Sequence, residues 1–340
     1  MKSALISVSN KEGIVEFAKG LQKLGIKILK EFKLKPRKNP NWKEYSRLLA
    51  RIKNPSGRIK IGIVGKYVDI GDYSLADSYI SINQALVHAG AKLNVGVDIN
   101  WIDSKRFEKN GSELKMLKEF NGIIIPGGFG SSGVEGKIKV IQYVREHNIP
   151  FLGLCYGMQL AVVEFARNLC GFNDANTTEV NKDTKYPVID ILPSQKKIMD
   201  EGQYGATMRL GAYAAMLNKD TKVYKLYKES TRIKEDAKRI SLLRSQFRLG
   251  RLEKNKPVIL ERHRHRYEVN PKFVDVLEKK GMVFSGYHIR NDGTKLMEFI
   301  ELPWHKFFIA TQGHPEFKSR LEKPSPLFYG FIKAAINKKS

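Results

Sequence analysis

The chain has 340 residues, 42% of them hydrophobic, which is enough for one large or two modest domains with a real core. It contains no run of about 18 apolar residues, so the sequence predicts no membrane-spanning helix, and the apolar stretch at the N-terminus is too short for a signal peptide. Because two cysteines, Cys155 and Cys170, do not make a disulfide framework, we expect reduced thiols in a cytoplasmic protein.

Much of the formal net charge of +25 lies in residues 27–60 and 222–256. Such stretches can attract an acidic partner, for example a nucleotide, RNA or an acidic protein surface. Neither stretch has a nucleic-acid-binding signature, and the aromatic residues are not spaced as a stacking platform. We therefore favour a Lys-rich solvated surface and do not expect nucleic-acid binding.

From residue 58 onward, apolar strands alternate with amphipathic helices. The pattern predicts strands at 58–67, 92–103, 121–130 and 149–155, and helices at 74–90, 104–120, 136–148 and 156–171. This alternation indicates an α/β fold with a parallel sheet that helices cover on both faces. Ligands bind beyond the carboxyl ends of such strands, so Gly127–Gly130 and Cys155 should lie near each other on one rim.

The strongest single motif is G-x-C-x-G at residues 153–157, between a predicted strand and a predicted helix. A nucleophile elbow needs this context, because its sharp turn requires small neighbours on both sides. Cys155 would stand at a helix N-terminus, which favours thiolate over thiol, and the backbone N–H of Tyr156 could face a developing oxyanion. The alternative is a buried cysteine in a strand that happens to end in glycine.

A partner for this thiol follows the predicted strand at 307–317. In an extended segment, residues two apart face the same side, and Pro315 discourages helix at the residue before it. His314 and Glu316 should therefore point the same way. A histidine that a carboxylate orients toward a cysteine is the logic of a catalytic triad.

Residues 262–266 read Arg-His-Arg-His-Arg. Strand alternation places Arg262, Arg264 and Arg266 on one face and the two histidines on the other. Paired histidines can bind a metal, but no Cys or Asp lies nearby at ligand spacing, so we expect no metal site.

Three short motifs, "GLCYGMQ", "PGGFG" and "GHPEF", resemble the class I glutamine amidotransferases. A longer ordered set resembles the C-terminal glutaminase domain of the CTP synthase family: "GIVGKY", "GGFGSSGVEGK", "ANTTEV", "GATMRLG", "ERHRHRYEVN" and "HPEFKSR". The resemblance implies the class I glutamine amidotransferase fold over residues 58–338. Residues 30–57 resemble the interdomain linker of that family.

The resemblance also implies roles for particular residues. Cys155 would attack the glutamine amide to form a γ-glutamyl thioester, with His314 as general base and acid and Glu316 as its orienting partner. The implied substrate-binding residues are Gly128 and Tyr156 for the oxyanion, and Gln159, Glu179 and Arg266 for glutamine. Glu179 could pair with the α-ammonium group and Arg266 with the α-carboxylate.

Several features depart from the family. The sequence has no G-x-x-x-x-G-K-[ST] loop, so we expect no cofactor in this chain; ATP, Mg²⁺ and UTP would belong to a synthetase domain that this chain lacks. Residues 1–29 resemble instead the first strand, helix and second strand of the IMP cyclohydrolase domain of the bifunctional purine enzyme. Ser132 stands where the family usually has arginine in the lid loop, which puts activation by GTP in doubt. The basic stretch 228–256 is longer than usual, and we expect a solvated helix rather than a partner surface or a nucleotide site.

The leading hypothesis is a glutaminase that hydrolyses L-glutamine and supplies ammonia for the amination of UTP to CTP. A catalytically quiet subunit of a separate synthetase is the first alternative, and another amide hydrolase on the same scaffold, such as a γ-glutamyl hydrolase, is the second. The partners expected are L-glutamine and a synthetase domain in trans; a homo-oligomer is left open.

Overall fold

The computed structural model describes residues 42–65, 69–70, 73–74, 79–192, 208–243 and 246–337. One unit ends at Tyr45 and a second runs from Ser46 onward; apart from the first residues of helix α3, the features below belong to the second unit. The predicted segment 1–29 lies outside the described residues. The predicted linker is described only from residue 42, where helix α3 (Trp42–Lys53) begins. Within these ranges, no helix is both long and apolar enough to cross a membrane.

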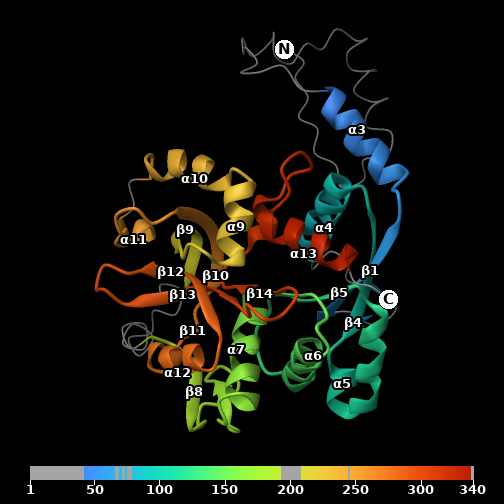
Figure 1. Cartoon of the computed structure of the whole chain (residues 1–340). Coiled ribbons are helices and arrows are strands. Elements are labelled where there is room, and N and C mark those ends of the chain that lie inside the picture. Colours follow the sequence, from blue (N-terminus) through green and yellow to red (C-terminus); the bar gives the residue numbers. More distant parts are fainter. Residues whose placement is uncertain are drawn as a thin grey trace, which may run out of the picture. The chain divides into compact units, whose positions relative to one another are not determined.

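A nine-stranded mixed sheet forms the centre of the described part of the chain (Figure 1). Neighbouring strands from β14 to β4 pair in parallel, as the sequence predicts, whereas β10, β9, β12 and β13 extend the sheet through antiparallel pairs. In spatial order the strands are β10 (Val258–His265), β9 (Arg209–Leu217), β12 (Val283–Ile289), β13 (Lys295–Glu301), β14 (Phe308–Thr311), β6 (Phe151–Leu154), β5 (Gly122–Ile125), β1 (Arg58–Gly65) and β4 (Gly96–Asp103).

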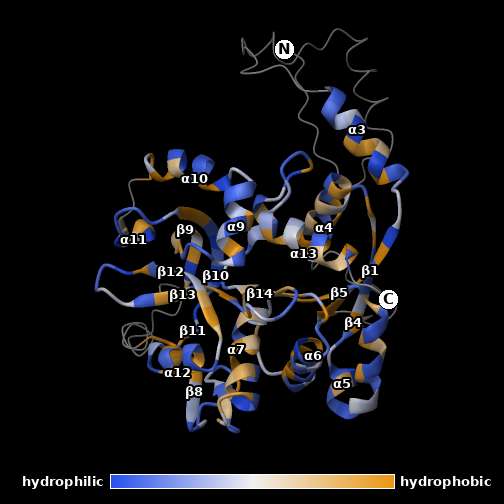
Figure 2. Ribbon diagram, in the orientation of Figure 1, coloured by the Kyte–Doolittle hydropathy of each residue, from blue (hydrophilic) through white to orange (hydrophobic). Residues whose placement is uncertain are grey.

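Helices cover both faces of this sheet. Side chains alternate along β5, so Ile124 packs into one hydrophobic cluster while Ile123 and Ile125 pack into another. The first cluster includes apolar residues of α4 (Ile80–Leu93), α9 (Lys222–Glu229) and α13 (Pro326–Ile336). The second includes residues of α5 (Lys105–Lys109), α6 (Val134–Glu146), α7 (Tyr156–Asn168) and α12 (Val274–Lys279). Figure 2 shows the hydrophobic residues concentrated in the central strands between these helices.

Smaller elements complete the described part of the chain. A three-stranded sheet has the order β11 (Glu268–Val269), β8 (Tyr186–Asp190) and β7 (Ala175–Thr177), and a two-stranded sheet joins β2 (Asp69–Ile70) to β3 (Tyr73–Ser74). The remaining helices are α10 (Arg232–Ile240), α11 (Gln246–Leu249) and the 3₁₀-helices η2 (Gly111–Glu119), η4 (Pro271–Phe273) and η5 (Pro315–Lys318).

Two predicted helices differ from the structure. The helix expected at 104–120 divides into α5 and η2, because the Asn110 side chain accepts a hydrogen bond from the Ser112 N–H and starts a new helix. The basic stretch 228–256 is partly helical, as expected, but it is not simply solvated. One side of α10 is buried and includes Arg232 and Asp236.

Candidate active site

Gly128, Cys155 and His314, three of the predicted site residues, follow three strands that are neighbours in the sheet. β6 lies between β5 and β14 and runs parallel to both. Parallel strands present their carboxyl ends at the same edge, so the segments that follow them meet there. One cavity is lined by Gly127, Gly128, Cys155 and His314 together. The prediction that the two glycine-bearing strand ends share a rim is therefore confirmed.

Cys155 occupies the sharp turn between β6 and α7. Its backbone has φ 52° and ψ −102°, a conformation that L-residues rarely adopt and that costs free energy. A Cβ on Gly153 would lie 2.8 Å from the Ala310 Cβ, and a Cβ on Gly157 would meet the Ile125 carbonyl oxygen. Only glycines fit on either side of this turn, which is the structural reason for the G-x-C-x-G spacing.

His314 follows β14 and faces Glu316. The Nδ1 atom of His314 lies 2.7 Å from the Oε1 atom of Glu316, so the two side chains meet as predicted. The expected extended segment is wrong, because Pro315–Lys318 form the 3₁₀-helix η5. The backbone N–H of His314 donates to the Arg262 carbonyl at 2.7 Å, which ties this turn to β10. Burial by itself would lower the pKa of His314, but the charges of Glu316 and Cys155, and hydrogen bonds to both side chains, raise this pKa well above its usual value.

Gly127 lies against both halves of the thiol–imidazole pair. A Cβ at this position would stand 3.0 Å from Cε1 of His314 and 3.6 Å from Cβ of Cys155. Any side chain here would push against the imidazole. The first glycine of "PGGFG" is thus explained by close approach of the backbone to the side chains of Cys155 and His314.

The loop after β5 is held by side chains of the candidate site. Tyr156 donates its hydroxyl to the Gly130 carbonyl at 2.8 Å, and the Gly130 N–H donates to Glu179 at 2.6 Å. Gly128 lies beside Tyr156, since a Cβ on Gly128 would be 3.7 Å from the tyrosine ring. The two residues predicted to form the oxyanion hole are therefore brought together; their role stays a prediction.

The predicted glutamine-binding residues line one cavity of about 320 Å³ beside Cys155. Gln159, Glu179 and Arg266 all contribute to its wall. The cavity has a carboxylate and a guanidinium among its walls, which suits a ligand that carries both an ammonium and a carboxylate group. A second cavity of about 330 Å³ also reaches Cys155, and its wall includes His314. Arg264 lines both cavities.

Sequence reasoning missed Gln312. This fully buried residue places its Nε2 atom 3.7 Å from the Cys155 Sγ atom, and its Oε1 atom accepts a hydrogen bond from Gln159 at 3.2 Å. Gln159 also donates to the Tyr267 carbonyl at 3.0 Å, so its amide joins α7 to the segment between β10 and β11. No local pattern marked Gln312, because its contact with Cys155 depends on the pairing of β14 with β6.

The other face of β10 carries a buried polar cluster. His263 and His265 lie on the face opposite Arg264, as the alternation predicts, and both are buried. Nδ1 of His263 lies 3.0 Å from Nε2 of His265. Burial, and then the charge of Arg209, holds the pKa of both rings well below the usual value. Arg209 itself bridges Glu298 at 2.7 Å and Glu268 at 3.2 Å.

This cluster has a cation of its own, the guanidinium of Arg209, between two carboxylates. In the described ranges, no group of three or more His, Cys, Asp or Glu side chains could hold a metal ion. The expectation that this chain binds no metal stays a prediction.

Comparisons with known proteins agree with this geometry. The family model described as glutamine amidotransferase class-I matches residues 74–334. The CTP synthase of Methanocaldococcus jannaschii is 46% identical over 344 residues, which cover 99% of this chain and 57% of the relative. The CTP synthase of Sulfolobus acidocaldarius is 47% identical over 314 residues, which cover 92% of this chain and 52% of the relative. The chain thus spans about half the length of the curated relatives it matches.

A solved structure of the Trypanosoma brucei CTPS glutaminase domain, with bound acivicin, is also similar. It is 34% identical in sequence with a TM-score of 0.68, and the match covers 83% of this chain and 95% of that one. This coverage means that nearly the whole of the solved domain has a counterpart here.

Proposed function

Because this chain belongs to the class-I glutamine amidotransferase family, we propose that it hydrolyses the side-chain amide of L-glutamine to glutamate and ammonia. The observation that carries the proposal is the strained Cys155 turn at the rim where His314 is oriented by Glu316. A nucleophile, a base and an orienting carboxylate are the parts that acyl transfer requires.

The reaction would proceed in two steps. Sγ of Cys155, after its proton has passed to His314, attacks the amide carbon and forms a tetrahedral oxyanion. This oxyanion is held by the backbone N–H groups of Gly128 and Tyr156. It collapses to a γ-glutamyl thioester as the imidazolium of His314 protonates the leaving nitrogen, which departs as ammonia. Water, deprotonated by the same imidazole, then attacks the thioester and releases glutamate and the thiol.

The cavity beside Cys155 would select free glutamine. Glu179 would attract the α-ammonium group and Arg266 the α-carboxylate, while the amide reaches the thiol. Glu179 also accepts the Gly130 N–H, so substrate recognition and the shape of the oxyanion loop share one carboxylate. The thiol, the imidazole and the backbone N–H groups supply the chemistry of both steps, so neither step would need a cofactor.

The use of the ammonia is part of the proposal. The relatives are named CTP synthases, so we infer that ammonia released here serves the amination of UTP to CTP by a synthetase domain, to which ATP, Mg²⁺ and UTP would bind. An ammonia-release assay with glutamine, run with and without UTP, ATP and GTP, measures whether these nucleotides alter turnover. This assay also addresses the effect of Ser132 on GTP activation.

Substitution of the two cysteines tests the nucleophile. Cys155→Ala should lower ammonia release by at least about 10³-fold, because the covalent route is lost. Cys170→Ala is the matched control, since this residue is the other cysteine, follows the opposite end of α7 and lines neither cavity. Circular dichroism and thermal melting establish that both variants fold. Unchanged ammonia release by folded Cys155→Ala would refute the assignment.

The alternative substrates are tested with the wild-type chain. Free glutamine should be hydrolysed in preference to an internal bond of a poly-γ-glutamyl peptide, because the α-nitrogen of the residue cleaved there is an amide and lacks the charge that Glu179 would recognise. Preferential hydrolysis of the peptide would favour a γ-glutamyl hydrolase. Hydrolysis of neither, with and without a synthetase partner, would favour a catalytically quiet subunit.

A further inference from the structure

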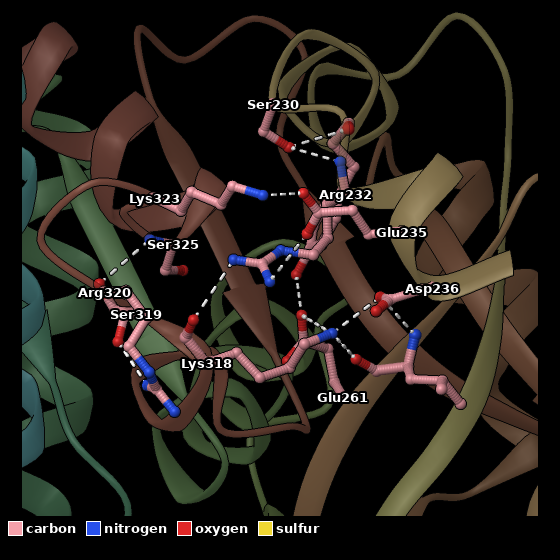
Figure 3. A network of polar contacts seen from close by, with 12 residues as sticks. Ser230, Arg232, Glu235, Asp236, Glu261, Lys318, Ser319, Arg320, Lys323 and Ser325 are labelled. Carbon is pink, nitrogen blue, oxygen red and sulfur yellow. Dashed lines mark hydrogen bonds and ion pairs between the residues drawn. The ribbon is translucent and has the colours of Figure 1, made fainter. Parts of the chain in front are cut away.

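Helix α10 belongs to the basic stretch whose role the sequence leaves open. Its buried side contributes two side chains to a polar network that Figure 3 shows from close by. Asp236 is fully buried and Arg232 nearly so. The helix therefore does more than present charge to solvent: it places an anion and a cation in the interior next to β10.

Asp236 binds both the strand and a lysine. Its Oδ2 atom accepts a hydrogen bond from the Leu260 N–H at 3.0 Å and pairs with the Lys318 Nζ atom at 2.7 Å. Lys318 also donates to the Leu260 carbonyl, and its Nζ atom lies 3.9 Å from the Glu261 carboxylate. The ammonium group is thus enclosed between α10 and β10, with its side chain only 11% exposed.

Lys318 is the last residue of η5, the short helix that contains Glu316. The backbone of this helix is anchored at both ends. At the start, the His314 N–H donates to the Arg262 carbonyl, and at the end, Arg232 donates to the Lys318 carbonyl at 3.3 Å. A single 3₁₀ turn has few hydrogen bonds of its own, so contacts with its surroundings set its orientation.

We propose that Asp236 and Lys318 are a positioning pair for the catalytic His314–Glu316 turn. The inference rests on the proposed glutaminase function and adds residues outside its reacting groups. The pair holds the end of η5 against α10, so that the carboxylate of Glu316 stays aligned with Nδ1 of His314. Neither member of the pair lines the two cavities that reach Cys155.

The same helix offers a matched control. Glu235 is adjacent to Asp236 in the chain and pairs with Lys323 and Arg232 at a more exposed position. Exposed ion pairs contribute little, whereas loss of one partner from a buried pair leaves the other charge uncompensated. Glu235→Gln should therefore leave turnover unchanged, although it removes the same charge from the same helix.

The test compares Asp236→Asn with Glu235→Gln and the wild-type chain. Asp236→Asn should lower kcat by roughly 10- to 100-fold, as expected for a shift of reacting groups by up to about 1 Å, with KM for glutamine changed by less than about twofold. The alkaline limb of the kcat profile, where His314 loses its proton, should move to lower pH because a looser Glu316 contact lowers the pKa of His314. A purely structural role would reduce stability without moving this limb.

A readout independent of turnover separates this inference from the proposed function. The NMR titration of the His314 ring, assigned with His314→Gln, should show a lower pKa in Asp236→Asn than in the wild-type chain. If wild-type turnover is present and both kcat and the His314 titration are unchanged in Asp236→Asn, the positioning pair is refuted. If wild-type turnover is absent, the proposed function fails, and the titration alone decides the inference.

A second variant tests the inference if Asp236→Asn does not fold. Asp236→Leu with Lys318→Met removes both charges together, which buried pairs tolerate better than the loss of one. It should fold and show the same loss of kcat and the same shift of the His314 titration. Wild-type kcat and titration in this folded double variant would overturn the inference.

Discussion

Replacement of Gly153 by alanine should separate the nucleophile from its base. Gly153 in β6 pairs with Ala310 in β14, and these two strands lead to Cys155 and His314. A new Cβ would lie 2.8 Å from the Ala310 Cβ and 3.0 Å from the Gly157 carbonyl group. Carbon atoms in contact prefer about 3.5–4.0 Å, so the strands or the first turn of α7 must move by roughly 1 Å.

This shift fixes the expected magnitudes. Overpacking of a core costs about 1–3 kcal/mol, so the free energy of unfolding should fall by that amount. A displacement of about 1 Å between reacting groups can reduce turnover by about 10²-fold, so kcat should fall further than the loss of folded protein explains. Thermal melting and steady-state ammonia release measure the two effects on the same samples.

Two further variants test whether the effect of Gly153→Ala comes from this close contact. A Cβ on Gly111 would meet nothing within 4 Å, so Gly111→Ala should leave both stability and kcat near the wild-type values. Ala310→Gly in the Gly153→Ala background moves the methyl group from one strand to the other and should restore part of the lost kcat. If Gly153→Ala alone has wild-type kcat and melting temperature, the close packing of β6 against β14 cannot be what aligns Cys155 with His314.

Two other predictions follow from buried charges. The Lys137 side chain is buried, with Nζ 5.5 Å from the Tyr156 ring centroid and 3.9 Å from a Cβ position on Gly128. A unit charge about 6 Å from an oxyanion contributes about 3 kcal/mol at an effective dielectric constant of 20, so Lys137→Met should lower kcat about 10- to 100-fold with little change in KM. Unchanged steady-state kcat would contradict a role of Lys137 in oxyanion stabilisation. Burial, countered by Arg209, raises the pKa of Glu268 to about 8. Because the folded state binds this proton more tightly than the unfolded state does, protonated Glu268 stabilises the fold. This contribution to the free energy of unfolding is complete below about pH 4 and is lost as pH rises through 8. Glu268→Gln should therefore flatten the fall in the free energy of unfolding between pH 5 and 9, measured by urea denaturation, and equal slopes in both chains would contradict the assignment.

Much of the parallel half of the fold could be predicted, because apolar strands alternate there with amphipathic helices. The elbow at Cys155 followed from local spacing, since it depends on only a few consecutive residues. The pairing of His314 with Glu316 was also expected, but from an extended segment, whereas the structure forms it at the start of η5. Gln312 could not be found in this way. Its contact with Cys155 depends on the pairing of β14 with β6, and strand order is a long-range property that local patterns do not encode.

The buried side of α10 illustrates the same limit. The helix reads as basic and polar, and α-helical spacing alone does not show that Asp236 pairs with Lys318, a residue far along the chain. Charged residues in a short polar helix are usually solvated, so the sequence pointed to the commoner outcome. Tertiary contacts with β10 and η5 decide otherwise in this protein.

The position of β14 in the sheet has a consequence for synthesis of the chain. β14 inserts between β6 and β13, and the imidazole follows it directly, so a ribosome must release nearly all of the amidotransferase region before thiol and imidazole can meet. Pairings between such distant segments form slowly. A nascent chain that extends only through α7 would therefore carry Cys155 without the imidazole of His314, and we expect it not to cleave glutamine until folding is complete.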